Sequence, residues 1–154
     1  MGKLHAIGLT WRFINDAWLR AAMTIVLGIE STAHTIGIAV LRDKEVLSNE
    51  KDAFATVSGG MIPAKVALHH EDAYAGLLRR ALEKAHIRLK DVQLIAYSDG
   101  PGLGHTLRIG AAAAKSLALL LNVPLVGVNH CIAHLEVAGL TTQAKDPVLL
   151  YYKY

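Results

Sequence analysis

The chain has 154 residues, of which 53% are hydrophobic and 19% are charged, so it has room for one ordinary domain and is too apolar to be disordered. Its formal charge of +3 does not indicate a nucleic-acid-binding protein. Three of the 16 basic residues fall in residues 1–22, and the rest of the chain, residues 23–154, is nearly neutral. The single cysteine, Cys131, excludes a disulfide within the chain, which is typical of a cytoplasmic protein. The low share of charged residues means that either an unusual part of the surface is buried inside the chain or it is covered by something absent from the chain, and we favour the second interpretation.

Two segments resemble membrane or export signals only superficially. Residues 109–128 are the most apolar, but a lysine, an asparagine and a proline interrupt them, so we expect no membrane span and no membrane partner. Residues 1–22 lack a continuous apolar run and do not form a secretory signal. Trp11, Ile14 and Trp18 share one helical face, which leaves an amphipathic docking helix as an alternative. We expect residues 1–22 to be an extension outside the fold.

Apolar runs separated by turn residues predict the elements in chain order. The first part is an antiparallel meander, with strands at residues 24–29, 35–41 and 45–48. A helix then begins at Pro63 and keeps an apolar stripe to about residue 86. Strands and helices alternate from there, which implies parallel pairing through right-handed crossovers. These later elements are strand 92–98, helix 107–121, strand 124–128, helix 130–137 and strand 147–152.

This order predicts the α/β class and a mixed sheet with a three-stranded antiparallel start and flanking helices. The same order describes a ribonuclease-H-like half of an actin/Hsp70-like (ASKHA) ATPase fold. Periodicity supports only the class, and the specific topology is an analogy.

The turn after the first strand is the first candidate site. Small residues let backbone N–H groups face outward beside the hydroxyls of Ser31 and Thr32, as phosphate binding requires, although a plain hairpin turn has the same composition. Glu30 ends an apolar strand, where a carboxylate is costly to desolvate unless it meets a cation or a donor. Glu30 is therefore a candidate contact for a metal-bound water or a substrate.

The second candidate is the glycine-rich loop at residues 100–104, which precedes a predicted helix. Amides at that helix start favour an anion. The loop matches neither the P-loop nor the dinucleotide fingerprint, and a sharp strand-to-helix turn explains it equally well.

The third candidate is the pair His130 and His134. Positions i and i+4 project from one helical face, so the two imidazoles can hold one metal ion. The pair also follows a predicted parallel strand, at the edge where such sheets bind ligands. A zinc protease needs a glutamate directly after the first histidine, and Cys131 stands there instead, so peptide hydrolysis is excluded.

Several segments, taken together and in this order, resemble the universal tRNA threonylcarbamoyladenosine transferase family (TsaD/Kae), once called glycoprotease. The tripeptide Ala33-His34-Thr35 is similar to the sequence of the archaeal and eukaryotic KEOPS-type branch at this place. The resemblance spans residues 23–151 and rests on the segments 28–35, 59–60 with Pro63, 69–70, 100–104 with 107–108, and 126–134.

The resemblance implies a two-lobed enzyme that moves threonylcarbamoyl from threonylcarbamoyl-adenylate to the exocyclic amine of the adenosine that follows the anticodon in ANN-reading tRNAs. It implies one divalent metal ion, iron or zinc, bound by His130, His134 and Tyr151. Glu30, the candidate contact identified from its place at the end of an apolar strand, is the expected catalytic residue. The resemblance also implies an adenine nucleotide, ATP or threonylcarbamoyl-adenylate. The residues expected at that nucleotide are Ser31, Thr32, His34 and Tyr151.

The implied partners are tRNA and the KEOPS subunits, a Bud-type kinase and a Pcc-type dimerisation subunit, or a second lobe, and the implied location is the cytoplasm. Residues 23–154 are predicted to be the amino-terminal lobe alone, truncated at the start of the second lobe and inactive by itself. Departures from the family pattern occur at Ile62, Ala64, Lys65 and His105. The alternatives are a noncatalytic ASKHA scaffold subunit and a sugar- or acetate-kinase-like lobe.

Basic residues also gather at the end of the predicted long helix. They indicate either a patch that neutralises tRNA phosphates or a solvated helix end whose cations offset the helix dipole. These residues are Arg79, Arg80, Lys84, Arg88 and Lys90.

Overall fold

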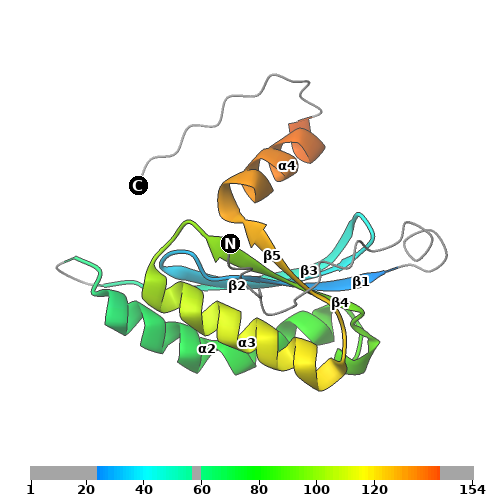
Figure 1. Ribbon diagram of the computed structural model, residues 1–154, viewed down its shortest axis with the longest axis horizontal. Helices are drawn as coiled ribbons and strands as arrows, with labels where there is room; N and C mark the ends of the chain where they lie inside the picture. The colour runs from blue at the N-terminus through cyan, green and yellow to red at the C-terminus, as the bar shows by residue number, and fades with distance from the viewer. Residues whose placement is uncertain (1–23, 57–59, 143–154) are drawn as a thin grey trace, which may run out of the picture.

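A computed structural model describes residues 24–56 and 60–142 of the chain (Figure 1). Five strands and three long helices follow one another in these residues, with a short 3-10 turn before the fourth strand. The elements are β1 (Ile25–Glu30), β2 (Thr35–Arg42), β3 (Glu45–Ala53), α2 (Pro63–Lys84), η1 (Leu89–Asp91), β4 (Leu94–Gly100), α3 (Gly104–Leu121), β5 (Leu125–Asn129) and α4 (His130–Thr142).

The strands form one mixed sheet in the order β3-β2-β1-β4-β5. The first three strands are antiparallel to one another, and β4 and β5 join β1 in parallel. At the centre of the sheet Gly28 pairs with Ala39 on one side and with Ala96 on the other. The predicted α/β class and the mixed sheet with its antiparallel start are confirmed, and the order is that of a ribonuclease-H-like half.

The core lies between the sheet and two helices. α2 and α3 run side by side along one face of the sheet, as Figure 1 shows. Alternate residues of β1 and β2 point into this layer, because side chains along a strand alternate between its two faces. Those fully or almost fully buried are Leu27, Ile29, Ile36, Ile38 and Val40.

Each helix has a feature that suits its place against the sheet. α2 begins with Pro63, whose missing N–H costs nothing at the first helical position. α3 buries Gly110 and Ala114, and small residues allow a helix to lie close to the strands. α3 ends at Asn122, whose φ of 53° is the left-handed conformation common at a helix end.

Two elements extend beyond the predicted limits. β3 continues from residue 48 to Ala53 through a charged stretch, because it is paired with β2 as far as Thr35 and exposes alternate side chains. α4 continues from residue 137 to Thr142. The predicted strand at residues 147–152 and the predicted extension at residues 1–22 lie outside the described residues.

Part of the apolar surface stays open to solvent. Leu119 and Leu120 of α3 are 82% and 73% exposed, and Ile132 and Val137 of α4 are also largely exposed. α4 rises from the end of β5, on the side of the sheet opposite to α2 and α3 (Figure 1). Within the described residues, no helix is both long enough and apolar enough to span a membrane.

Candidate metal and nucleotide site

The candidate site lies at the carboxyl edge of the parallel strands. β1 ends at Glu30, and β5 ends at Asn129, directly before His130. β4 lies between these two strands and contributes small residues, Ser98 and Gly100, at the same edge. Adjacent strands are about 4.8 Å apart, so long side chains from β1 and β5 can meet across the end of β4.

Asn129 starts α4 and thereby fixes the histidine pair. Its side-chain Oδ1 accepts hydrogen bonds from the backbone N–H of Cys131 at 2.9 Å and of Ile132 at 3.2 Å, which caps the helix. His130 and His134 then lie one turn apart, with 3.2 Å between their Nε2 atoms and 4.5 Å between ring centroids. The predicted one-face geometry is therefore present.

Glu30 and His130 are in direct contact, although 100 positions separate them in the sequence. His130 Nδ1 donates to Glu30 Oε2 at 3.0 Å, and the other carboxylate oxygen accepts from the Thr32 N–H at 2.6 Å. The Thr32 hydroxyl lies 3.4 Å from the same His130 nitrogen. A carboxylate can only accept here, so the neutral form of His130 carries its hydrogen on Nδ1 and its lone pair on Nε2, the atom that faces His134.

The histidine pair fits a divalent metal ion. Two nitrogens bound at about 2.0–2.1 Å in tetrahedral geometry are about 3.3 Å apart, close to the separation of 3.2 Å between the two Nε2 atoms. A carboxylate on the far nitrogen of one histidine is also a common feature of metal sites. The described part of the chain contains no group of three or more His, Cys, Asp or Glu side chains that could hold a metal ion, and Tyr151 lies outside it.

The turn at residues 31–34 is packed closely against the protein. Ser31 is fully buried and donates its N–H to Ser98 Oγ at 3.0 Å, and Thr32 is 5% exposed. The N–H groups of both residues are thus used within the protein, whereas His34 is exposed. Of the three predicted nucleotide residues in this turn, His34 alone presents its side chain to solvent.

The glycine-rich loop and α3 close over this turn. Leu103 N–H donates to the Thr32 carbonyl oxygen at 2.7 Å. A Cβ on Gly102 would lie 2.8 Å from Thr32 Cα, and one on Gly110 would lie 2.9 Å from Ser31 Cβ, closer than real Cβ atoms approach. The loop at residues 100–104 therefore acts as a close strand-to-helix turn that rests on residues 31–34.

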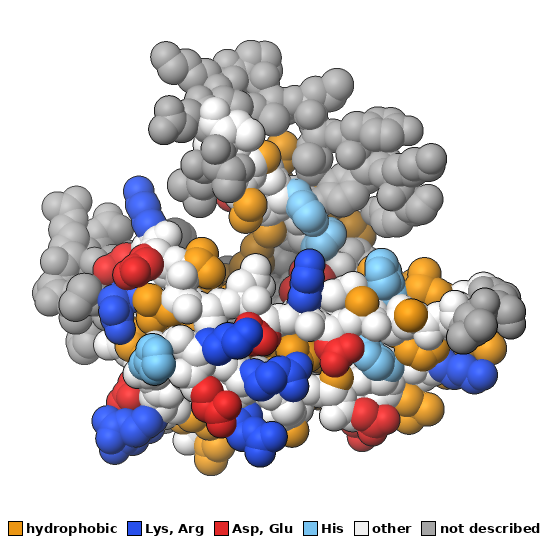
Figure 2. Space-filling model, turned by 180° about the vertical axis from the view of Figure 1, so that it is seen from behind, with side chains coloured by type: hydrophobic (Ala, Val, Ile, Leu, Met, Phe, Trp, Pro, Cys, Tyr) orange, Lys and Arg blue, Asp and Glu red, His pale blue; other side chains and the backbone are white. Residues whose placement is uncertain are grey.

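Four of the five residues in the basic cluster are paired with carboxylates. Lys84 Nζ lies 2.7 Å from Glu50 and Arg80 3.8 Å from the same residue. Arg79 pairs with Glu83 and Arg88 with Asp91. Acidic and basic side chains are interspersed on the face of the molecule shown in Figure 2. This pairing favours the solvated helix end over a tRNA patch.

Sequence reasoning missed two residues of the site. Ser98 supplies the acceptor for the Ser31 amide, and Gly110 makes room for the Ser31 side chain. Neither has a recognisable local pattern, since both act on a turn that is distant in the sequence. Asn129 did have a signal, because asparagine directly before a helix is a favoured cap.

Comparison with known proteins gives a consistent family. A family profile described as tRNA N6-adenosine threonylcarbamoyltransferase (TsaD) matches residues 44–153. Proteins of that name from Saccharolobus islandicus and Thermococcus kodakarensis are 50% identical over 129 residues and 52% identical over 127 residues. Each alignment covers 82% of this chain and 39% of the relative.

Among solved structures, YeaZ from Pseudomonas aeruginosa shares the fold, with a TM-score of 0.63 at 20% identity over 79% of this chain and 50% of that chain. The chain therefore spans 39% of the length of the curated relatives it matches, and it belongs to the tRNA N6-adenosine threonylcarbamoyltransferase (TsaD) family.

Proposed function

We propose that the chain is the amino-terminal lobe of an enzyme that transfers threonylcarbamoyl from threonylcarbamoyl-adenylate to the amine of the adenosine that follows the anticodon in ANN-reading tRNAs. The observation that carries this proposal is the meeting of Glu30, His130 and His134 at the carboxyl edge of the sheet. Relatives that are about half identical to this chain have the name of that transferase.

The proposed metal ligands are His130 and His134, with Tyr151 as a further ligand, and the metal is iron or zinc. When bound, the ion supplies Lewis-acid polarisation of the carbonyl that the adenosine amine attacks. Glu30 accepts the Nδ1 hydrogen of His130 and so keeps the Nε2 lone pair directed at the position shared with His134. Glu30 thus contributes to catalysis as a positioning residue.

The proposed second ligand is an adenine nucleotide, ATP or threonylcarbamoyl-adenylate, at the turn formed by residues 31–34. Because Ser31 and Thr32 are buried, His34 is the side chain of this turn that can contact the nucleotide. Thr32 contributes indirectly, through its hydrogen bond to Glu30. The proposed macromolecular partners are tRNA and subunits of a KEOPS-type complex in the cytoplasm.

A chimera tests this proposal. Residues 24–142 of this chain replace the corresponding segment of the Thermococcus kodakarensis relative, which is 52% identical. Threonylcarbamoylation of an ANN-reading tRNA is then measured with threonylcarbamoyl-adenylate supplied, together with the metal content of the purified protein. We expect His134→Ala to abolish both transfer and bound metal, and Glu30→Gln to lower metal affinity or activity by about 10–100-fold.

His105→Ala is the matched control, since His105 is exposed in the first turn of α3 and makes none of these contacts in the described residues. It should leave transfer and metal content unchanged. An active chimera that keeps its transfer rate and its metal in the His134→Ala form would refute the proposal.

A further inference from the structure

Among the described residues, no helix lies along one of the two faces of the sheet. α2 and α3 lie along the other face, and α4 leaves the carboxyl end of β5 and rises away from the strands (Figure 1). Three of the five strands, β1, β4 and β5, are parallel to one another. Parallel strands in globular proteins are covered on both faces, because both faces carry apolar side chains. The face without a helix, called the open face below, therefore needs an occupant.

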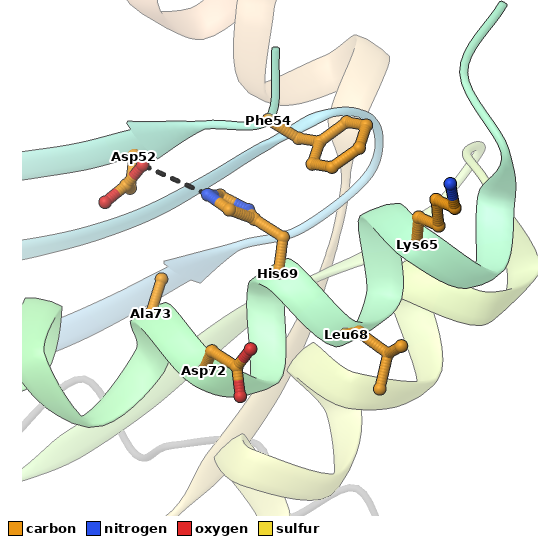
Figure 3. A pocket seen from close by; sticks show the side chains of 7 residues that line it. All are labelled: Asp52, Phe54, Lys65, Leu68, His69, Asp72 and Ala73. Carbon is orange, nitrogen blue, oxygen red and sulfur yellow. Dashed lines mark hydrogen bonds and ion pairs between the residues drawn. The ribbon is translucent and has the colours of Figure 1, made fainter. Parts of the chain in front are cut away.

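The helix side of the sheet is covered as far as its edge strand, β3. Figure 3 shows His69 of α2 reaching Asp52 of β3, with 3.1 Å between His69 Nε2 and Asp52 Oδ1. Ser48 of the same strand donates its hydroxyl hydrogen to the Ala81 carbonyl oxygen of α2 at 2.8 Å. Even polar side chains of the edge strand thus have partners on α2. The two faces of the sheet differ strongly in how far they are covered.

The open face is apolar and has room above its centre. It is formed by the residues that alternate along the strands with the buried side chains of the core. At its centre, Gly28 of β1 is flanked by Ala39 and Ala96. A Cβ on Gly28 would meet only the Ala39 carbonyl oxygen of the described residues, at 4.0 Å. Larger apolar residues of the same face surround this centre, namely Val26, Leu41, Leu94, Val126 and Val128.

The segment that precedes β1 can reach the open face. The Thr24 N–H donates to Asp43 Oδ1 at 2.9 Å, and the Asp43 N–H donates to the Thr24 carbonyl oxygen at 3.0 Å. The chain therefore enters β1, the central strand, at a fixed point on the amino edge of the sheet. A helix of residues 7–21 would be about 22 Å long, close to the length of about 20 Å for the six residues of β1. Such a helix, running back along β1, would cover the face from end to end.

The sequence of this segment predicts a helix with one strongly apolar side. Large apolar residues recur at intervals of three and four, which places them on one helical face: Ile7, Trp11, Ile14 and Trp18. The charged residues of the same stretch fall on the opposite side, four positions apart: Arg12, Asp16 and Arg20. Large side chains on one side of a helix are complementary to a sheet face whose centre consists of glycine and alanine.

We propose that residues 7–21 form an amphipathic helix that packs on the open face, with Trp11, Ile14 and Trp18 over the centre at Gly28. Of the two interpretations of residues 1–22, the docking helix thus replaces the extension outside the fold. The inference goes beyond the proposed function and does not depend on it, because the contacts involve neither the histidine pair nor the turn at residues 31–34.

Tryptophan fluorescence of the full chain tests this docking without any substitution. The chain has two tryptophans, Trp11 and Trp18, so its tryptophan emission reports on this segment alone. The reference is a synthetic peptide of residues 1–23. We expect the tryptophans of the chain to emit at shorter wavelength than those of the peptide and to be quenched less by acrylamide. Emission and quenching equal to those of the peptide would overturn the inference.

Two substitutions in the full chain, one on each side of the contact, keep both tryptophans. Gly28→Val fills the space above the centre of the open face, and Ile14→Asp places a charge in the apolar stripe. Overpacking by the valine should lower the ratio of docked to free segment by about 5- to 150-fold, so that emission and quenching move toward those of the peptide. Because both changes remove the same contact, the double variant should lose less stability than the sum of the two single losses. Additive losses would contradict the docking.

Matched control variants exist for both substitutions. Gly60→Val makes the same change at an exposed glycine, where a Cβ would meet nothing within 4 Å. Phe13→Asp introduces the same charge next to Ile14 but outside the apolar stripe. Neither control should change the emission or the quenching of the tryptophans.

The other occupants and locations give different results. The exposed end of α3 is the competing apolar surface, and release of the tryptophans by Leu119→Ser instead of Gly28→Val would place the segment there and overturn the inference. Protection that develops only as the protein concentration rises would mean that the segment docks on a second copy, which also contradicts it. These measurements use no metal, nucleotide or tRNA, so their failure leaves the proposed function intact. The chimera contains residues 24–142 only, so its failure leaves the docking intact.

Discussion

Gly110 and Gly76 are both interior glycines of long helices, yet alanine should have opposite effects at the two positions. In α2, a Cβ on Gly76 would meet only the end of the flexible Arg80 side chain, at 3.4 Å. In α3, a Cβ on Gly110 would meet both heavy atoms of the Ser31 side chain, with Ser31 Cβ at 2.9 Å. The Ser31 hydroxyl can rotate away, but its Cβ moves only if the backbone of the turn moves.

The magnitude follows from two opposing contributions. Replacing an interior helical glycine by alanine stabilises a helix by about 0.5–1 kcal/mol, and this gain is common to both variants. Overpacking of a close contact costs about 1–3 kcal/mol, and only Gly110→Ala has this cost. We therefore expect Gly76→Ala to be more stable than the original chain, and Gly110→Ala to be less stable than Gly76→Ala by about 1–3 kcal/mol.

The assay is denaturant unfolding followed by circular dichroism, with the free energy of unfolding compared at equal m values. Ser31→Gly removes both atoms that a Cβ on Gly110 would approach too closely. The double variant Ser31→Gly/Gly110→Ala should therefore recover about 1 kcal/mol or more relative to the sum of the single changes. Equal stability of Gly110→Ala and Gly76→Ala, with no coupling to Ser31, would refute the reasoning that α3 rests directly on the turn.

Two further predictions concern Gly102, which packs against this turn, and the buried His70 of α2. Gly102→Ala places a Cβ 2.8 Å from Thr32 Cα, and because this contact is with backbone, we expect a loss of about 1–3 kcal/mol together with faster amide exchange at Leu103. The pKa of His70 is lowered from its ordinary value of 6.5, so the unfolded chain binds the proton first as the pH falls. Stability present above pH 6.5 should then be lost as the pH falls through the lowered pKa, and His70→Gln should flatten that part of a pH series of unfolding curves.

The fold was largely predictable because, for most elements, the local sequence pattern favours the same secondary structure as pairing and packing in the sheet. β1 is a short apolar strand bounded by turn residues, and Pro63 marks the start of α2. In β3 the local sequence no longer predicts the whole strand. Residues 50–52 are Glu, Lys and Asp, which are poor strand formers, and they are extended because β2 offers hydrogen-bonding partners as far as Thr35. Pairing with a neighbouring strand overrides propensity at such an edge.

The site was predictable residue by residue but not as a set of contacts. The spacing of His130 and His134 is a helical pattern, so their common face follows from the sequence alone. The bond between Glu30 and His130 depends on the strand order, which places β1 and β5 on either side of β4. A residue list cannot give that order. Once the order is known, the small side chain of Ser98 and the absence of one at Gly100 explain how the bond can cross the intervening strand.

The glycines near the site show why a motif and its physical role must be considered separately. A glycine-rich loop before a helix is typical of phosphate binding, and its amides suit an anion. Here Gly102 of that loop packs against the backbone of Thr32, and Gly110, inside the following helix, packs against the side chain of Ser31. Both contacts are with the turn whose Thr32 N–H donates to Glu30, the residue that accepts a hydrogen bond from His130. The need for glycine at these two positions is therefore met by contact with the protein itself, and it would persist even if the site held no ligand.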